Sequence, residues 1–271
     1  MIKDAIFDAP TYGLRRAARQ GGPELSVSVP MFDEGGGALR LIEEISAALA
    51  GVDHEIIAVD DCSRDSTPSA LAAAAAVSSS RLRRLRHGAN AGQSRAIRTG
   101  VLAARGPIVA TLDGDGQNDP ADIPALFQAI RRPDADPLLA MVAGERRERI
   151  DARSKKLASR VANRIRRLIL DDGSADTGCG LKLFYRDAYL RLPYFDHNHR
   201  YLPALMKREG FVVEFQPVGH RAREYGASKY NNLGRLAVAF RDILGVVWLK
   251  SRARSPLTIS ELEPRGDYDT M

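Results

Sequence analysis

Strand-like and helix-like segments alternate through the first half of the chain, and no other feature constrains the fold more strongly. Segments typical of strands occupy residues 25–31, 55–59, 81–86 and 107–112. Segments with the apolar spacing of helices lie between them, at residues 38–50, 67–77 and 90–104. Because strands that alternate with helices form parallel sheets, the pattern predicts an α/β fold with helices on both faces of the sheet.

The second half of the chain is less regular. It predicts helices at 122–131, 151–170, 202–208 and 233–250, strands at 138–143 and 211–218, and a glycine-punctuated loop at 176–184 that enters a strand. The 271 residues suffice for one large α/β domain or two small ones. We expect a partly disordered N-terminal arm over 1–23, an α/β domain over 24–232, an amphipathic helix over 233–255 and a disordered tail over 256–271.

Acidic residues follow three of the predicted strands, at the point where each strand ends. They are Asp33 and Glu34, Asp60 and Asp61, and Asp113 with Asp115. In open α/β sheets, ligands bind outside the carboxyl ends of the strands. We therefore expect the three acidic loops to meet at one edge of the sheet and to form one site.

The third of these loops, after the strand at 107–112, has the spacing of a metal site. Asp113 and Asp115 are two residues apart, so both side chains point to the same face while the chain stays extended. The glycines beside them let a ligand approach the backbone, and Gln117 lies close by. Such oxygen ligands suit Mg²⁺ or Mn²⁺. The alternative is a strand that ends in a polar turn, because Asp-Gly is also common in turns.

The charge of the chain favours an anionic partner. The net charge is +6 and the isoelectric point is near 9.5, which fits nucleic acid, an anionic membrane or a phosphorylated substrate. Aromatic residues make up only 6% of the chain, so a groove for single-stranded nucleic acid is disfavoured and no nucleic-acid partner is expected.

The two cysteines indicate neither a disulfide framework nor a zinc site, so we expect the protein to occupy a reducing compartment. We see no secretory signal and no apolar run of about 18 residues that would span a membrane.

Two segments each leave two interpretations open. Residues 146–167 contain ten lysines and arginines. This segment is either a solvated basic helix or a binding surface for phosphate or anionic lipid headgroups. The apolar helix at 233–250 contains Trp248 and is followed by Arg252 and Arg254. It either packs on the core or lies in a membrane interface.

Five motifs occur in a fixed order between about residues 25 and 250. They are Ser28-Val29-Pro30-Met31-Phe32-Asp33-Glu34, Val59-Asp60-Asp61-Cys62-Ser63-Arg64-Asp65, Asn90-Ala91-Gly92, Asp113-Gly114-Asp115-Gly116-Gln117 and Gly226-Ala227-Ser228-Lys229-Tyr230. In combination they resemble family 2 glycosyltransferases of the GT-A fold, and among these the dolichol-phosphate or polyprenyl-phosphate mannosyltransferases. The resemblance implies a Rossmann-like, mostly parallel central sheet with helices on both faces.

The resemblance also implies a role for each matching position. The residues implied to bind substrate are Pro30, Phe32, Glu34, Val59, Asp61, Gly114, Arg146 and Ser228. Those implied to act in catalysis are Asp113, Asp115, Arg153, Asp176, Arg223 and Lys229, with Mg²⁺ or Mn²⁺ at Asp113, Asp115 and Gln117. The chain departs from the family pattern at Phe32, where Tyr is usual, at Asp33, where Asn is usual, and at 178–181, where a Ser-Gly-Phe loop is usual.

The implied reaction moves a sugar from a GDP- or UDP-linked donor onto a polyprenyl phosphate, with inversion at the anomeric carbon. A divalent ion and basic side chains would stabilise the charge that develops on the departing diphosphate. A phosphate acceptor is already mostly a dianion at neutral pH, so it needs positioning rather than a strong base. A sugar hydroxyl would instead need a carboxylate base such as Asp176 or Asp172.

Three hypotheses follow from these observations. The first is an enzyme at the cytoplasmic face of a membrane that makes a polyprenyl-phosphate sugar. Mannose is the first expectation for that sugar, ahead of another hexose, an N-acetylhexosamine or a hexuronic acid. The second is a family 2 enzyme that glycosylates a sugar hydroxyl in a polysaccharide. The third is a basic membrane- or nucleic-acid-binding domain with a degenerate site, which the intact acidic set disfavours.

Overall fold

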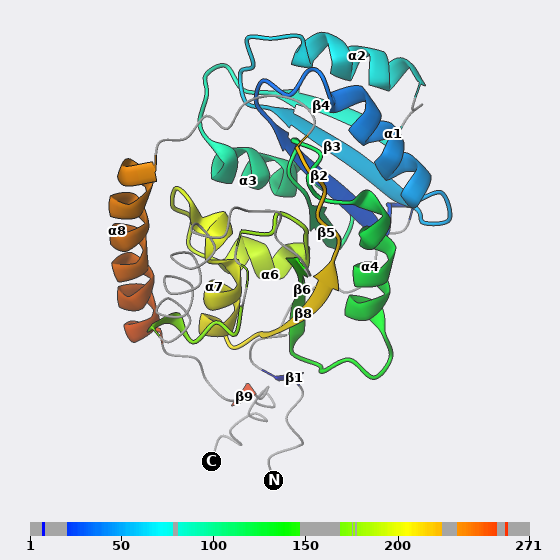
Figure 1. Ribbon diagram of the computed structural model, residues 1–271. Coiled ribbons are helices and arrows are strands. Elements are labelled where there is room, and N and C mark those ends of the chain that lie inside the picture. The colour runs from blue at the N-terminus through cyan, green and yellow to red at the C-terminus, as the bar shows by residue number, and fades with distance from the viewer. Residues whose placement is uncertain are drawn as a thin grey trace, which may run out of the picture.

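A seven-stranded sheet forms the centre of the molecule (Figure 1). The computed structural model describes residues 7–8, 21–77, 81–146, 169–174, 176, 178–223, 232–253 and 258–259. The strands of the sheet are β2 (Leu25–Met31), β3 (His54–Asp60), β4 (Leu82–Arg86), β5 (Ile108–Thr111), β6 (Leu139–Arg146), β7 (Lys182–Tyr185) and β8 (Val212–Val218). They lie in the order β4-β3-β2-β5-β7-β6-β8. Of these seven, β7 alone runs antiparallel to both neighbours, so the expected parallel α/β sheet is confirmed with one reversed strand.

Helices cover both faces of this sheet. The helices are α1 (Ala38–Ala48), α2 (Thr67–Val77), α3 (Gln93–Ala103), α4 (Ile123–Arg131), α6 (Arg186–Arg191), α7 (Leu202–Arg208) and α8 (Asn232–Ser251), with 3-10 turns η3 (Pro120–Asp122) and η4 (Asn198–Arg200). In Figure 1, α1 and α4 lie to the right of the sheet, α3, α6 and α7 lie to the left, and α8 packs outside α7. Within the described chain, no helix is long and apolar enough to cross a membrane.

The core explains why the central strands are apolar throughout. Every residue of β2 and β3 is buried, because helices lie on both sides of these strands. From α1, Leu41, Ile42 and Ile45 point into this core, at the spacing of one helical face. Burial of this apolar surface fixes the register of the strands and hence the position of the loops at their ends.

Several elements differ from the sequence-based expectation. The short helix α6 and the turns η3 and η4 were not expected. Phe7–Asp8 of the expected arm pairs with Thr258–Ile259 of the expected tail, a contact for which the sequence gives no signal. Most of the expected basic helix, residues 151–168, lies outside the described residues, and the expected division of the chain into domains stays a prediction.

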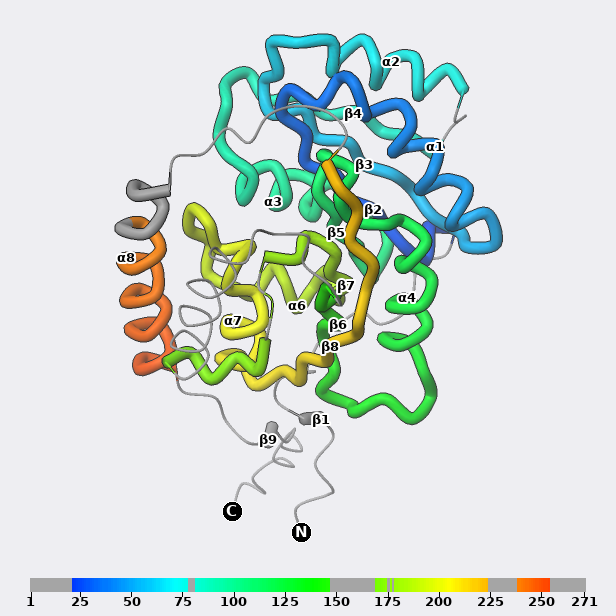
Figure 2. The backbone as a smooth tube through the Cα atoms, viewed as in Figure 1, coloured from blue at the N-terminus to red at the C-terminus, as the bar shows by residue number. Residues whose placement is uncertain are grey.

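The loops that follow β2, β3 and β5 gather at one edge of the sheet. In the tube of Figure 2, the segment that leaves β8 runs up to the same edge and ends beside these loops. The first turn of α3 lies there as well. Five segments from different parts of the sequence therefore surround one region of the surface.

Candidate functional site

A cavity of about 380 Å³ lies at this edge, in the volume range of small-molecule sites. Its lining residues are Pro30, Met31, Phe32, Glu34, Asp61, Asn90, Gly92, Gln93, Ala96, Asp113, Gly114, Asp115 and Arg223. The structure thus brings the three acidic loops together, with Asp61, Asp113 and Asp115 in the wall of one cavity. Eight of the site residues implied by the sequence line it: Pro30, Phe32, Glu34, Asp61, Asp113, Gly114, Asp115 and Arg223. The strand order places them there.

Asp61 ties the end of β3 to the start of α3. Its Oδ1 accepts a hydrogen bond from the Ala91 N–H at 2.9 Å and lies 2.7 Å from Nδ1 of His87, while its Oδ2 accepts from the Gly92 N–H at 2.8 Å. On its other side, the His87 ring lies 2.9 Å from the Thr99 hydroxyl. The carboxylate therefore fixes the first turn of α3 against the cavity. Sequence reasoning missed His87, since no spacing relates it to Asp61.

Arg223 connects the loops after β2 and β5. Its Nη2 donates to Oε1 of Glu34 at 2.5 Å, and its Nη1 lies 4.0 Å from Oδ2 of Asp115. All three side chains are largely buried. A guanidinium held in this way is suited to recognise a diphosphate, because its planar fork of N–H groups matches phosphate oxygens.

Protein atoms hold Asp113 from three sides. Its Oδ1 accepts from Nε2 of Gln93 at 2.6 Å, and its backbone N–H donates to Oδ1 of Asn118 at 3.2 Å. The register of β5 and β7, continued outward from their last pair, places residue 180 opposite residue 113. A Cβ at Gly180 would clash with the carboxylate of Asp113, so glycine is required for this close contact.

The electrostatic environment of Asp113 disfavours its charge. Burial, together with the negative charge of Asp115, raises the pKa of Asp113 to about 6. The positive charges of Lys182 and Arg146 and the hydrogen bond from Gln93 oppose this rise. A carboxylate with a raised pKa in a cavity indicates a candidate functional site, and two adjacent carboxylates are ligands suited to a divalent cation.

Lys182 is a buried lysine close to Asp113. It is the first residue of β7, and because β7 is reversed, its start lies at the carboxyl edge of β5. Its ammonium donates to the carbonyl of Cys179. Burial lowers the pKa of Lys182, while the negative potential of Cys179, Asp113 and Asp176 acts in the opposite direction. The sequence offered no signal for this residue, which occupies an ordinary strand position.

Arg146 and Asp176, both implied by the family resemblance, pair with each other. The Nε of Arg146 lies 2.5 Å from Oδ2 of Asp176, and its Nη2 donates to Oδ1 at 2.7 Å. A Cβ at Gly178 would lie 2.9 Å from that Nη2, so the loop passes close to the guanidinium. The two side chains lie next to Lys182 and outside the lining of the cavity.

Other expected residues are not brought into the cavity. Val59 is fully buried in β3 against α3 and does not line it. Gln117 meets the acidic pair through its backbone, because its N–H donates to Oδ1 of Asp115 at 3.1 Å. Arg153, Ser228 and Lys229 lie outside the described residues.

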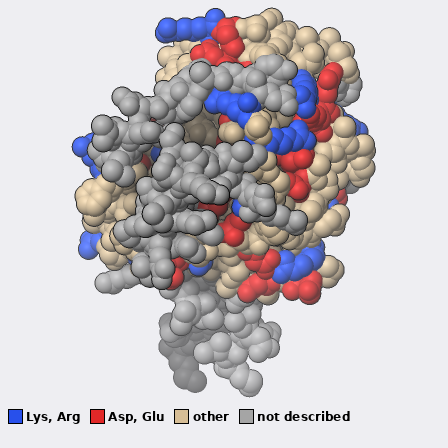
Figure 3. All heavy atoms as spheres, viewed as in Figure 1, with Lys and Arg blue, Asp and Glu red and all other residues tan. Residues whose placement is uncertain are grey.

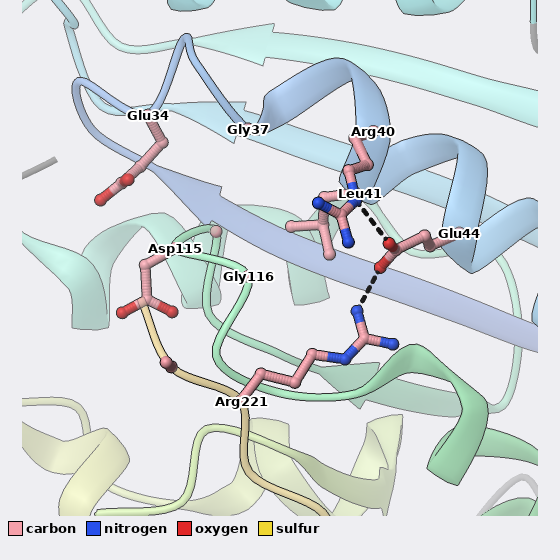
Figure 4. A pocket seen from close by; sticks show the side chains of 10 residues that line it. Glu34, Gly37, Arg40, Leu41, Glu44, Asp115, Gly116 and Arg221 are labelled. Carbon is pink, nitrogen blue, oxygen red and sulfur yellow. Dashed lines mark hydrogen bonds and ion pairs between the residues drawn. The ribbon is translucent and has the colours of Figure 1, made fainter. Parts of the chain in front are cut away.

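A second, smaller hollow of about 30 Å³ adjoins the cavity across Glu34 and Asp115 (Figure 4). On its far side, Arg221 donates to Glu44 at 2.6 Å, as Figure 4 shows. Arg221 also donates to Asp119 at 2.7 Å. Its backbone N–H also donates to the carbonyl of Gln117 at 2.9 Å. Figure 3 shows acidic and basic side chains interleaved on this side of the molecule. These bonds anchor the segment that carries Arg223 two residues later.

The oxygen atoms of the cavity fit Mg²⁺ or Mn²⁺. Asp113 and Asp115 both line it, and carboxylate oxygens are the ligands that these ions prefer. Within the described parts of the chain, no three His, Cys, Asp or Glu side chains converge as a metal site. Two carboxylates suit an ion that takes its other ligands from a diphosphate and water, as Mg²⁺ commonly does.

Comparison with known proteins identifies relatives of this chain. The profile of glycosyl transferase family 2 matches residues 26–192. The chain is 33% identical over 240 residues to the dodecaprenyl-phosphate galacturonate synthase of Rhizobium johnstonii, with 85% of this chain and 69% of that protein covered. It is 32% identical over 210 residues to the undecaprenyl-phosphate 4-deoxy-4-formamido-L-arabinose transferase of an Enterobacter species, with 77% of this chain and 63% of that protein covered.

Solved structures share the fold. A glucosyl-3-phosphoglycerate synthase from Mycobacterium tuberculosis, crystallised with Mn²⁺, UDP and glucosyl-3-phosphoglycerate, aligns with a TM-score of 0.62 at 17% identity and covers 90% of this chain and 82% of that one. Its complex with UDP alone aligns with a TM-score of 0.63 at 18% identity, with the same coverage. The GT-A fold expected from the sequence is confirmed.

Proposed function

The chain belongs to glycosyl transferase family 2, and we propose that it transfers a sugar from a nucleotide-diphosphate donor to a polyprenyl phosphate. The observation that carries the proposal is the single cavity in which Asp61, Asp113, Asp115 and Arg223 meet. The relatives named above, a dodecaprenyl-phosphate and an undecaprenyl-phosphate sugar enzyme, support the acceptor class.

In the proposed complex, the nucleoside and the diphosphate of the donor occupy opposite ends of the cavity. Pro30 and Phe32 at the end of β2, together with Asp61 after β3, form the end for the nucleoside, and the carboxylates of Asp113 and Asp115 face the diphosphate. A Mg²⁺ or Mn²⁺ ion bound there supplies positive charge to the leaving diphosphate. Arg223 adds a second positive group, and Glu34 holds its guanidinium in place.

The acceptor phosphate needs little activation. Its second pKa is near 6, so it attacks as a dianion without a strong general base. Asp176 uses both carboxylate oxygens on Arg146, which supports a role in holding that arginine rather than in removing a proton. Arg146 and, beyond the described residues, Arg153, Ser228 and Lys229 are proposed to face the donor and acceptor phosphates. In-line attack on the anomeric carbon inverts its configuration.

A membrane surface supplies the lipid acceptor, and α8 offers a contact for it. Phe240, Leu244 and Trp248 follow at four-residue intervals on one helix face and are 65%, 55% and 61% exposed. Val246 on the opposite face is fully buried, so the helix is apolar on both sides. Exposed Arg241 lies beside the stripe. An apolar stripe with basic neighbours favours a helix that lies in the interface of an anionic membrane, here proposed as the cytoplasmic face.

A transfer assay tests the proposal. The full chain is incubated with Mn²⁺, undecaprenyl phosphate in detergent and radiolabelled GDP-mannose or UDP-galacturonic acid. The two donors differ in both nucleotide and sugar, so each tests one nucleotide–sugar combination. We expect label in the organic phase with one donor, and none when undecaprenol replaces the phosphate.

Two results would contradict it. If every donor fails with the lipid phosphate but one labels an oligosaccharide, the acceptor is a sugar hydroxyl, which is the competing family 2 activity. If no donor is used and no nucleotide binds, the cavity is not a nucleotide-sugar site.

A further inference from the structure

The glutamine that touches the two-aspartate motif comes from a different part of the chain than the sequence indicates. Gln117, three residues from the centre of the motif, meets Asp115 only through its backbone N–H in the contacts described above. Gln93, twenty residues before Asp113, donates its side-chain amide to the Asp113 carboxylate at 2.6 Å. Both Gln93 and Asp113 line the cavity, whereas Gln117 does not.

Hydrogen bonds just before Gln93 in the chain fix the position of this residue. It is the first residue of α3, and the two preceding backbone N–H groups, of Ala91 and Gly92, donate to Asp61. The side chain of Gln93 thus reaches Asp113 from a helix end that the neighbouring strand β3 holds in place. Asp61, at the proposed nucleoside end of the cavity, is thus linked through the start of α3 and Gln93 to Asp113, at the proposed diphosphate end.

The contact from Gln93 restrains the carboxylate of Asp113, and the other contacts of this residue add to the restraint. The Asn118 side chain holds the backbone N–H of Asp113, and Gly180 lies directly against the carboxylate. Rotation of the carboxylate about its last torsion would break the hydrogen bond from Gln93. An amide donor restrains the group without adding a charge that would compete with a cation.

We infer that Gln93 is a positioning residue that orients the Asp113 carboxylate for the divalent ion of the donor complex. The inference rests on the proposed function, because it concerns the ion that accompanies the nucleotide diphosphate. Loss of a side chain that orients a metal ligand lowers metal affinity by about tenfold to a hundredfold in other metal sites. We expect Gln93→Leu to fall at the lower end of that range, since the carboxylate itself remains.

Calorimetric titration of the nucleoside diphosphate, with UDP and GDP as probes, measures this without turnover. The Mn²⁺ concentration that gives half-maximal nucleotide binding should rise about tenfold in Gln93→Leu. Nucleotide binding in EDTA and the melting temperature should stay close to those of the wild-type chain. Gln93→Asn keeps the amide but is one methylene shorter, so it should lose most of the same metal affinity if reach matters. Gln128→Leu, on the exposed face of α4, is the control.

Gln117→Leu tests the competing assignment. An equal or larger loss of Mn²⁺ dependence in Gln117→Leu than in Gln93→Leu overturns the inference, and so does a Gln93→Leu variant with wild-type Mn²⁺ dependence. If Gln93→Leu melts far below the wild type, the Gln93→Asn titration decides the question. A wild-type chain that binds neither nucleotide at any Mn²⁺ concentration overturns the proposed function as well, which separates the two failures.

Discussion

Asp113 sits where its charge is unfavourable for the folded chain. Burial and the neighbouring Asp115 raise its pKa to about 6, from 3.8 for a free side chain. A carboxylate selected for folding alone would be neutralised by an arginine or replaced by an apolar residue. Its presence at the end of β5 is understandable if a cation completes the site, and stability is then lower in the absence of that cation.

Asp113→Asn should therefore stabilise the metal-free chain near neutral pH. Because the pKa is higher in the folded state, that state binds an extra proton between about pH 4 and pH 6, so wild-type stability falls as the pH rises through this window. The full shift corresponds to about 3 kcal/mol at pH values above it. Melting temperatures should show the variant several degrees higher at about pH 7.5 and level with the wild type near about pH 4.

Asp53→Asn, at an exposed carboxylate, is the control for the change of one charge. A variant Asp113→Asn that melts below the wild type at neutral pH would contradict the unfavourable environment of the charge. Saturating Mn²⁺ should reverse the order of the two proteins, since only the wild type gains from binding.

Arg223 should contribute to nucleotide affinity through both its charge and its shape. A charge-assisted hydrogen bond is worth about 1.5–3 kcal/mol, so Arg223→Met should weaken binding of the nucleoside diphosphate by about tenfold or more. Arg223→Lys keeps the charge but loses the fork and should give an intermediate affinity. Titration calorimetry with Arg131→Met as the control checks this. An Arg223→Lys variant with wild-type affinity would show that the geometry of the fork is unimportant, and equal affinities of the Met and Lys variants would show that the charge without the fork contributes nothing.

At the scale of the elements, the start of α3 depends on one backbone conformation. Gly92 precedes the helix with φ of 85° and ψ of 161°, a region that is essentially restricted to glycine. Its two hydrogen-bonded neighbours, the Asp61 carboxylate and the first turn of α3, need the chain to turn there. The glycine of the Asn90-Ala91-Gly92 motif is thus explained by backbone geometry.

Gly92→Ala should destabilise the fold by about 1–3 kcal/mol, although no atom lies within 4 Å of the added Cβ. Gly88→Ala is a matched control, because it also has open space around the Cβ but lacks a positive φ. Denaturant unfolding should show a lower midpoint only for the first variant. Equal effects of the two would mean that the positive-φ conformation of Gly92 imposes no strain.

An element can be predicted from the sequence when residues close together in the chain specify it, and not when distant residues do. The strands β2, β3 and β5, and the helices between them, carry local periodicity, so their positions and the convergence of the three acidic loops follow from the sequence. Lys182 and Gln93 reach Asp113 through pairing across 69 and 20 residues, and no periodic pattern encodes such contacts. The reversal of β7, which brings Lys182 to the site, also has no local signal, since a strand reads the same in either direction.

At the scale of the whole molecule, membrane contact should depend on the stripe formed by Phe240, Leu244 and Trp248. The triple serine variant exposes no core residue, so its melting temperature should change little, while binding to vesicles of anionic phospholipid should fall at least about tenfold. Co-sedimentation with vesicles measures the binding. Serine at Val77 and Leu102, two exposed apolar residues on other helices, is the control.

A strong retention of vesicle binding in the triple variant would place the membrane contact elsewhere. Nucleotide binding in solution should be unchanged in the same variant, because the stripe lies away from the cavity. Transfer to a water-soluble, short-chain prenyl phosphate should be retained for the same reason.

The uninterrupted backbone ladder from β4 to β8 has a mechanical consequence. Asp61 and Asp113, which follow β3 and β5, and the loop that leads into β7 are all attached to one hydrogen-bonded sheet. The two walls of the cavity therefore do not open about a hinge between them. A substrate must enter from the open rim, and any closure over it falls to segments that project from the sheet. The distance between Asp61 and Asp113 is accordingly set by the sheet, and in the proposed function it fixes the separation between the nucleoside and diphosphate ends of the donor site.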